Sequence, residues 1–206
     1  MKVGALVIGQ TPRPDLEAVL GLQEVLMRGA LDLVTEPPPL EPGASFPLRT
    51  RMRDGRVVVV DEPLLEPLLQ KQIESLQDEG AGAIVLLCAG PFPRLRATVP
   101  LVHPFRIATG VFRTAGIERI LALVPIAEQV GPAEAKWADA GFSVQARVFP
   151  PDDLPTFAQA CAGDFEAIVF DYVGLPSDLL AATRERLGIP VFDLGHLAAT
   201  CLNAII

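Results

Sequence analysis

The feature that most constrains the fold is a regular alternation of short, continuous apolar runs with segments of helical pattern. Residues 3–9 and 83–88 are apolar almost throughout and rich in β-branched residues, which is typical of strands buried on both faces of a parallel sheet. Several of the helical segments between such runs end at a glycine, as helices commonly do. This alternation predicts a mostly parallel sheet covered by helices, the α/β class.

The pattern predicts the following strands: residues 3–9, 46–52, 56–61, 83–88, 101–105, 119–125, 142–149, 167–172 and 189–194. It predicts helices over residues 16–27, 64–79, 109–116, 131–140, 154–163, 177–187 and 195–206. Asp54-Gly55, between two of the strands, is typical of a tight hairpin turn. The proline-rich stretch over residues 35–47 predicts a loop.

The two parts of the chain share a local pattern. Residues 83–88, with Gly90 after them, resemble residues 167–172, with Gly174 after them. Such a repeat is typical of a duplicated βα unit, so we expect two pseudo-symmetric halves with a cleft between them. The expected division is residues 1–107 with 195–206, and residues 108–194.

Composition narrows the class of protein. Half of the 206 residues are apolar, which is ample for a buried core, and the net charge of −8 disfavours nucleic-acid binding. No apolar run approaches the roughly 18 residues that span a bilayer, and the start shows no signal-peptide pattern, so we expect a cytoplasmic protein without a membrane partner. Three scattered cysteines, two histidines and the lack of a glycine-rich nucleotide motif predict neither disulfide, metal nor cofactor.

The carboxyl ends of the predicted strands define the candidate site, because ligands of open parallel sheets bind there. The loops at these ends comprise residues 10–15, 88–93, 125–129, 171–174 and 193–196. If the two halves face each other, these loops converge on one cleft.

Cys88 is the strongest candidate for chemistry. It ends a predicted strand and a glycine follows two residues later, so backbone N–H groups of the next turn are expected to lower its pKa and supply a thiolate as base or nucleophile. The alternative is a small buried apolar residue. Cys161 and Cys201 lie among apolar neighbours in predicted helices and are expected to be packing residues.

Tyr172 holds the equivalent place in the second half. Its phenol is expected to donate a hydrogen bond to a carboxylate or an enolate, or else to pack at the strand end. Asp171 precedes it, so the two side chains should alternate and only one should face the cleft squarely. Asp171 is a candidate ligand contact, or a cap for a nearby helix.

Further candidate ligand-binding residues lie along the same rim: Gln10, Thr11, Arg13, Ala89, Gly90, Gln129, Val173, Gly174 and His196. Gln10 and Thr11 offer neutral donors close to a helix start, and Arg13 is expected to hold an anion or to pair with Asp15. His196 is a candidate proton donor, or a capping or surface residue.

A basic cluster stands out in this acidic chain. It consists of Arg49, Arg51, Arg53 and Arg56, and alternate spacing places the first three on one face of a strand. The cluster is expected to be a solvated hairpin face; a lid over an anionic ligand or a subunit contact is the alternative.

Two motifs resemble the AroM family. They are Ile-Gly-Gln-Thr-Pro-Arg-Pro-Asp at residues 8–15 and Leu-Leu-Cys-Ala-Gly-Pro-Phe-Pro at residues 86–93. Shorter matches fall at residues 29–32, 48–55, 124–129 and Lys136-Trp137. The family is of unknown function. Its fold resembles that of the aspartate/glutamate racemases, which are cofactor-independent enzymes with two α/β halves.

That resemblance implies specific chemistry, and the sequence departs from the pattern of its relatives at two places. At the first, Ala89 and Pro91 stand where relatives commonly have Thr and Glu. The racemases use two cysteines, one from each half, to remove and return the proton beside a carboxylate. Tyr172 stands at the second position here, and a phenol is poorly matched to a thiolate near neutral pH. We therefore expect either a one-base isomerase-like or lyase-like enzyme that uses Cys88 on a small carboxylate, or a binding protein that retains the cleft. Homodimers are common in that superfamily, so a homodimer is also expected.

Overall fold

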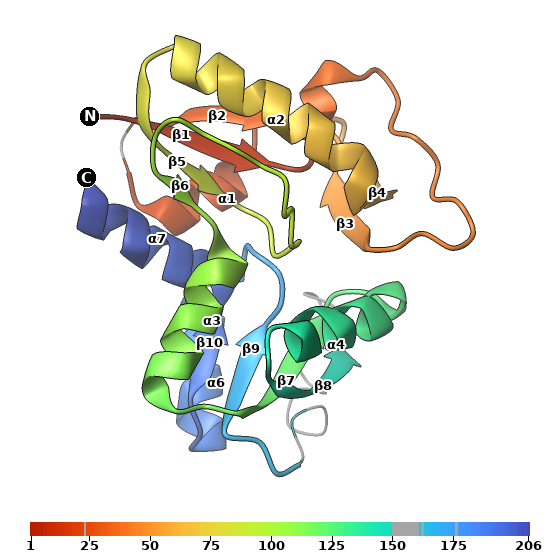
Figure 1. Cartoon of the computed structure of the whole chain (residues 1–206), viewed down its shortest axis with the longest axis vertical. Helices are drawn as coiled ribbons and strands as arrows, with labels where there is room; N and C mark the ends of the chain where they lie inside the picture. The colour runs from red at the N-terminus through yellow and green to blue at the C-terminus, as the bar shows by residue number, and fades with distance from the viewer. Residues whose placement is uncertain (23, 150–160, 162, 176) are drawn as a thin grey trace.

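The computed structural model describes residues 1–22, 24–149, 161, 163–175 and 177–206, and within these it shows two α/β halves (Figure 1). A four-stranded parallel sheet forms the centre of each half. The first sheet has the order β2 (Leu26–Gly29), β1 (Lys2–Val7), β5 (Ala81–Leu86) and β6 (Leu101–Val102). The second has the order β8 (Ser143–Val148), β7 (Arg119–Val124), β9 (Ala167–Phe170) and β10 (Val191–Asp193).

The two sheets have the same connectivity. In each, the first strand is central, the second lies at one edge, and the third and fourth follow on the other side. Strands β5 and β9 therefore occupy equivalent places, in agreement with the repeat noted in the sequence. This arrangement confirms the predicted α/β class with two parallel-sheet halves. The residue numbers at which the chain divides stay a prediction.

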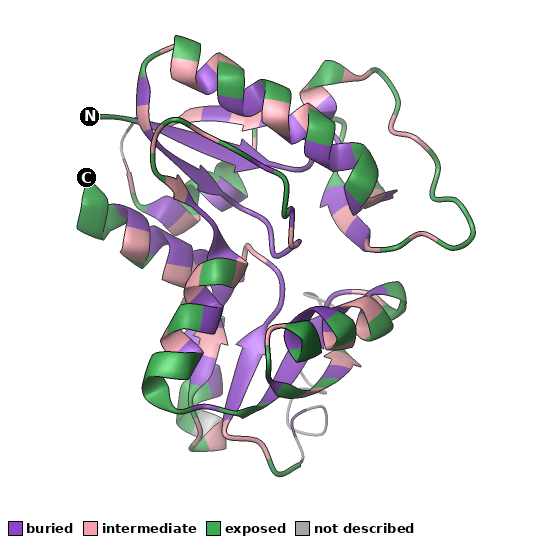
Figure 2. Cartoon of the chain, in the orientation of Figure 1, coloured by how far each residue is buried: buried purple, intermediate pink, exposed green. Residues whose placement is uncertain are grey.

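Both sheets are covered by helices on their two faces, which is why the central strands β1, β5, β7 and β9 are buried and apolar over almost their whole length (Figure 2). In β1, Leu6 packs with helix α2 on one face, whereas Val3 and Ala5 pack with α1 and α7 on the other. In β7, Ala122 packs towards α3 and α4, and Leu123 towards α6. The helices are α1 (Pro14–Leu20), α2 (Glu62–Asp78), α3 (Pro104–Ala115), α4 (Val130–Asp139), α6 (Ser177–Leu187) and α7 (Leu194–Ile205), with 3-10 turns η1 (Ala30–Leu33) and η2 (Ala127–Gln129).

The largest differences from the sequence prediction lie in two stretches, residues 16–29 and 101–109. The first helix ends at Leu20 rather than at residue 27, because Gly21 adopts a left-handed conformation with φ 64°, and Met27 belongs to strand β2. The strand predicted over residues 101–105 is only two residues long, because Pro104 begins helix α3. Most of the predicted helix over residues 154–163 lies outside the described residues.

Helix α7 connects the halves. It follows β10 of the second sheet directly and packs against α3, α1 and β5, so the C-terminus ends beside the first half (Figure 1). No helix in the described part of the chain has the length and apolar character that a bilayer crossing requires.

A separate hairpin lies beside the first sheet and reaches the second half. Strands β3 (Pro47–Arg51) and β4 (Val57–Asp61) pair antiparallel, as predicted, and β3 also contacts η2. The hairpin approaches the chain after β1 closely, where the Gln10 N–H donates to the Arg51 carbonyl at 3.1 Å. A Cβ atom on Gly9 would lie 2.3 Å from that same carbonyl oxygen. Only glycine therefore permits this approach.

This close approach yields a prediction for stability. Gly9→Ala should lower the free energy of unfolding by about 1–3 kcal/mol, because the hairpin backbone must move to admit a methyl group. The matched control is Gly110→Ala in α3, where an added Cβ meets nothing within 4 Å. Helix propensity should make that variant about 0.5–1 kcal/mol more stable. Urea unfolding followed by circular dichroism measures both, and a Gly9→Ala variant as stable as the parent would contradict the account.

Candidate active site at the junction of the two halves

A cavity of about 150 Å³ opens where the carboxyl ends of the strands of both halves meet. It is smaller than the roughly 300–1,000 Å³ of sites for drug-sized ligands, so a small molecule suits it. Its wall combines the ends of β1, β5, β7 and β9 with strand β3 of the hairpin. Eight of the residues predicted for the site line it: Arg13, Cys88, Ala89, Gln129, Asp171, Tyr172, Val173 and Gly174.

Cys88 lies just beyond β5 and is 6 % exposed. The Gly90 N–H donates to its Sγ at 3.4 Å, which is the contact expected from the glycine in the sequence. Burial nevertheless raises the pKa of the thiol to about 12, and the opposing effects of the Gly90 N–H and of Lys136 are smaller. The prediction of a lowered thiol pKa is therefore wrong, because desolvation outweighs one backbone hydrogen bond. The resting side chain is a neutral thiol.

The loop that carries Cys88 is tightly fixed. Phe92, in this loop, has φ 35°, a conformation that costs a non-glycine residue about 1–3 kcal/mol. Its ring is fully buried in the core beneath the hairpin. A Cβ atom on Gly90 would lie 2.6 Å from the Phe92 ring, so glycine is needed there for packing. Packing of Phe92 thus offsets the backbone strain and holds the turn after Cys88.

A buried ion pair joins the two loops of the site, and sequence reasoning missed it. Lys136 Nζ donates to Asp171 Oδ1 at 2.6 Å and to the Ala89 carbonyl at 2.9 Å. Both charged side chains are almost fully buried, at 3 % and 2 % exposure. The Trp137 indole donates to the other Asp171 oxygen at 3.2 Å. Helix α4 thereby holds the loop after β5 and the loop after β9 together.

An aromatic shell surrounds the lysine of this pair. Lys136 Nζ lies 4.7 Å from the centre of the Phe105 ring and 5.5 Å from those of Phe46 and Trp137. Helical periodicity placed Lys136 in a helix but gave no reason for a cation to be buried there. The available signal was the Lys136-Trp137 pair among the AroM-like segments.

Tyr172 and Asp171 both belong to the cavity wall, although β9 ends at Phe170 and strand alternation does not extend to them. Which of the two faces a ligand squarely stays a prediction. Asp171 binds Lys136 and Trp137, so these contacts, rather than a helix cap, account for its position. Tyr172 is 9 % exposed and its ring packs edge-on against Phe170.

Arg13 belongs to the cavity wall, but its guanidinium is already hydrogen-bonded within the protein. It forms two hydrogen bonds with the Asp15 carboxylate, at 2.9 and 2.7 Å. This contact lowers the pKa of Asp15, with smaller contributions from the charges of Arg13 and Arg51. Of the two alternatives from the sequence, the local salt bridge is the one present.

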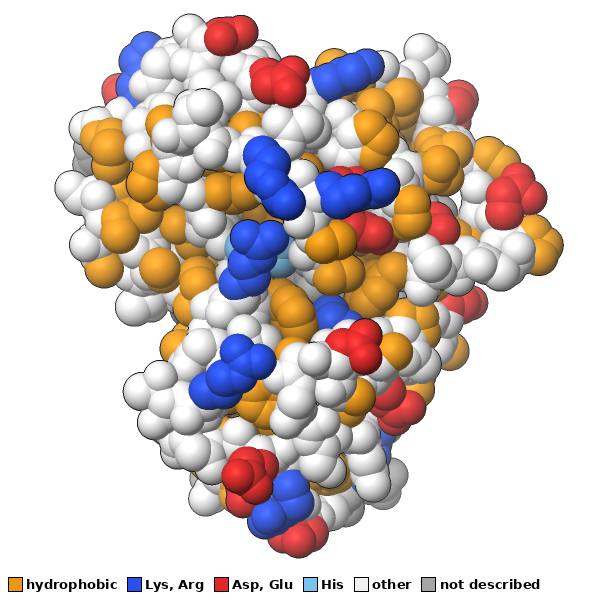
Figure 3. Space-filling view, in the orientation of Figure 1, with side chains coloured by type: hydrophobic (Ala, Val, Ile, Leu, Met, Phe, Trp, Pro, Cys, Tyr) orange, Lys and Arg blue, Asp and Glu red, His pale blue; other side chains and the backbone are white. Residues whose placement is uncertain are grey.

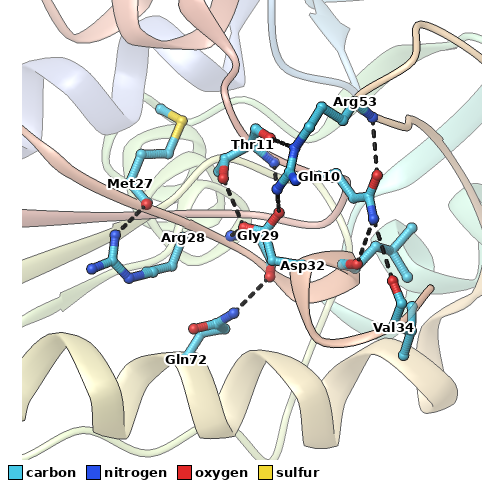
Figure 4. Close-up of polar contacts among 10 residues, drawn as sticks. Gln10, Thr11, Met27, Arg28, Gly29, Asp32, Val34, Arg53 and Gln72 are labelled. Carbon is cyan, nitrogen blue, oxygen red and sulfur yellow. Dashed lines mark hydrogen bonds and ion pairs between the residues drawn. The ribbon is translucent and has the colours of Figure 1, made fainter.

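Gln10 and Thr11 lie away from the cavity, where they anchor the first loop (Figure 4). Thr11 donates to both carboxylate oxygens of Asp32, at 2.9 and 2.8 Å. The Gln10 amide donates to the carbonyls of η1 and of the residue after it, and accepts from the Arg53 backbone N–H. Arg53 also pairs with Asp32 at 3.2 Å. Their polar atoms therefore bind the protein itself, and the structure does not bring these residues to the ligand cavity.

His196 and Gly90 are likewise absent from the cavity wall. His196 lies at the start of α7, where its backbone N–H and its imidazole Nδ1 both contact Asp193 Oδ1, at 2.7 and 2.9 Å. The hydrogen bond to Asp193 raises the pKa of this histidine. Gln129 does line the cavity; it is 5 % exposed, and its Oε1 has no hydrogen-bond partner among the described residues.

Strand β3 supplies a basic wall to the cavity. Arg49 and Arg51 line it, whereas Arg53 and Arg56 of the same cluster point to other partners. Basic side chains also gather near the junction of the halves on the face shown in Figure 3. Within the described ranges, no group of three or more His, Cys, Asp or Glu residues is placed to hold a metal ion.

Comparison with solved structures shows the racemase type of fold. An arylmalonate decarboxylase superposes with a TM-score of 0.68 at 16 % identity, covering 98 % of this chain and 92 % of the other. The maleate isomerase Iso from Pseudomonas putida S16 gives 0.69 at 14 % identity, with 100 % and 92 % covered. The allantoin racemase from Klebsiella pneumoniae gives 0.64 at 15 % identity, with 100 % and 87 % covered.

Sequence comparison assigns the family. No curated protein matches the chain at a significant level. The model described as AroM protein matches residues 3–205, almost the whole chain. With the AroM-like segments spread over both halves of a racemase-type fold, the chain belongs to the AroM family.

Proposed function

We propose that this protein is a cofactor-independent enzyme that acts on a small carboxylate, with Cys88 as the proton-transferring group. The observation that supports this most directly is that a buried thiol and a basic wall share one small cavity. Proteins of the same fold include, by their names, a decarboxylase, an isomerase and a racemase, all of them enzymes that break or rearrange bonds in small molecules.

The protonation state of Cys88 favours a role as proton donor. With its pKa raised to about 12 by burial, the thiol carries a proton at neutral pH. In a decarboxylation, the bond to the leaving carboxylate breaks, CO2 departs and the electron pair stays on carbon as an enediolate. The S–H group then gives its proton to that carbon, and the thiolate is reprotonated by water. The nearby guanidinium groups stabilise the enediolate charge.

One thiol is sufficient for this chemistry, whereas racemisation requires two matched bases. Tyr172 faces the same cavity from the place equivalent to Cys88, but phenols ordinarily have a pKa near ~10 and are poor bases at neutral pH. A one-donor reaction, such as decarboxylation or isomerisation, therefore fits the site better. In such a reaction Tyr172 serves as a hydrogen-bond donor to the substrate.

A second candidate function is ligand binding without catalysis. The raised pKa of Cys88 and the tyrosine in place of a second thiol both favour it, because neither side chain is a ready base. The cavity and its basic wall are common to both functions, so the two are distinguished by turnover and not by binding.

Turnover in D2O tests the catalytic role. The parent protein, incubated with a panel of small mono- and dicarboxylic acids, should incorporate deuterium beside a carboxylate or release CO2 from at least one of them, as followed by proton NMR. Cys88→Ser should lower that rate by about 10²-fold or more, because a hydroxyl is a much weaker proton donor to carbon.

The matched control for this experiment is Cys201→Ser, since Cys201 is a half-buried cysteine outside the cavity. It should leave the rate within about twofold of the parent, as expected for a substitution remote from the reacting groups. Tight binding of an acid with no exchange or CO2 release by any protein would instead support the binding function.

Alkylation of Cys88 tests its electrostatic environment. With iodoacetamide, the rate at Cys88 should rise tenfold per pH unit without a plateau up to about pH 10, because the thiolate is the reactive form and the pKa is about 12. Asp171→Asn should accelerate the reaction by removing a nearby negative charge, whereas Lys136→Met should not. Peptide mapping separates Cys88 from Cys201.

The two variants also control for loss of structure, because each leaves a buried charge without its partner. Simple opening of the cavity would accelerate alkylation in both of them. A plateau in the parent near pH 8.5, the ordinary thiol range, would show that Cys88 is not held in an apolar site.

A further inference from the structure

We propose that Arg49 and Arg51 of strand β3 bind the two anionic groups of a dicarboxylate substrate, so that the hairpin sets the charge specificity of the site. This inference rests on the proposed function. It extends the proposed substrate from a small carboxylate to a dicarboxylate, which carries two negative charges. The supporting observation is that some arginines near the cavity have carboxylate partners among the described residues and two do not.

Most arginines near the site already have carboxylate partners. Arg13 binds Asp15, Arg53 binds Asp32, and Arg56 lies 2.6 Å from Asp54 and 3.3 Å from Glu36. Arg49 and Arg51 differ. Neither side chain forms a hydrogen bond or an ion pair within the described part of the chain, although the chain carries an excess of acidic residues. The charge of Arg51 makes only a small contribution to the lowered pKa of Asp15, whose direct partner is Arg13.

The charged residues around the cavity have two positive charges in excess. Three arginines and two aspartates, Asp15 and Asp171, belong to the cavity wall. Asp15 is matched by Arg13, and Asp171 by Lys136 behind the wall. The positive charges of Arg49 and Arg51 remain, in a protein whose net charge is −8. A ligand with two negative charges would neutralise them.

The placement of the two arginines favours separate anionic groups over one compact anion. Residues at alternate positions of a strand point to the same side and are about 7 Å apart at their backbones. Each guanidinium can bind one carboxylate in a bidentate manner. A short dicarboxylate would give each guanidinium its own bidentate partner, and a single phosphate or sulfate is the alternative that the binding measurements must exclude.

The hairpin backbone is fixed well enough to make this placement specific. The hydrogen bond from Gln10 to the Arg51 carbonyl and the close approach at Gly9 hold β3 against the end of β1. Leu48 and Met52, on either side of the arginines in sequence, are buried in the core of the first half. The guanidinium groups therefore extend from an anchored strand and not from a free loop.

Binding measurements test the proposal. Isothermal titration calorimetry on the full chain compares malonate and succinate with their half-amides, malonamate and succinamate, which match them in shape but carry one charge. At least one dicarboxylate should bind about tenfold or more tightly than its half-amide, and more tightly than inorganic phosphate. Equal affinity for acid and half-amide, or for phosphate, would overturn the proposal.

Variants assign the effect to the hairpin. Arg49→Gln and Arg51→Gln should each weaken dicarboxylate binding by about 10-fold to 100-fold and should abolish the preference over the half-amide. Arg56→Gln is the matched control, because it lies in the same hairpin but its guanidinium binds Asp54 and Glu36. The proposal fails if the three variants behave alike.

Protection of Cys88 from alkylation separates this proposal from the proposed function. If acid and half-amide bind equally and protect Cys88 equally, the charge specificity is wrong but a carboxylate site beside Cys88 stands. If no acid binds or protects Cys88, both proposals fall. Dicarboxylate binding that is tight in the Cys88→Ser variant and lost in Arg49→Gln supports the role of the hairpin independently of catalysis.

Discussion

The buried Lys136–Asp171 pair determines how the two halves of the site meet. Removing two charges from water is unfavourable unless each finds close partners, and here the partners come from separate segments. Asp171 follows β9, Lys136 belongs to α4, and the Ala89 carbonyl follows β5. Satisfying the lysine therefore requires the loop beside Cys88 and the loop beside Tyr172 to lie together. Both loops also contribute to the cavity wall.

The same burial that fixes the loops also determines what Cys88 is able to do. A thiol enclosed by apolar neighbours keeps its proton, in contrast to the thiolate that a strand end with a following glycine led us to expect. The positive charges that would favour a thiolate are partly cancelled, since Lys136 is paired with Asp171. The unpaired positive charges lie instead on the hairpin, across the cavity. In the function proposed above, the proton donor and the anion-binding groups therefore belong to different segments of the chain.

The sequence predicted the fold well because its signals are local. Continuous apolar runs identify β1, β5, β7 and β9, and Asp54-Gly55 identifies the hairpin. It predicted the site less well, because the site depends on contacts between distant residues. Nothing local shows that Thr11 prefers Asp32 to a ligand, that Lys136 is buried, or that Arg49 lacks the kind of partner that Arg56 has. The early end of the first helix does have a local signal, since Gly21 adopts the left-handed conformation that ends it.

The equivalent places of β5 and β9 have a stereochemical consequence. In a symmetric two-thiol cleft, a planar intermediate can be protonated from either side. Here only one wall carries an S–H group, and the opposite wall carries the phenol of Tyr172. A prochiral enediolate held between them would receive its proton on one face alone, so the product would have a single handedness. Under the proposed function, the identity of the residue at position 172 would thus determine whether the site interconverts mirror-image products or forms one of them.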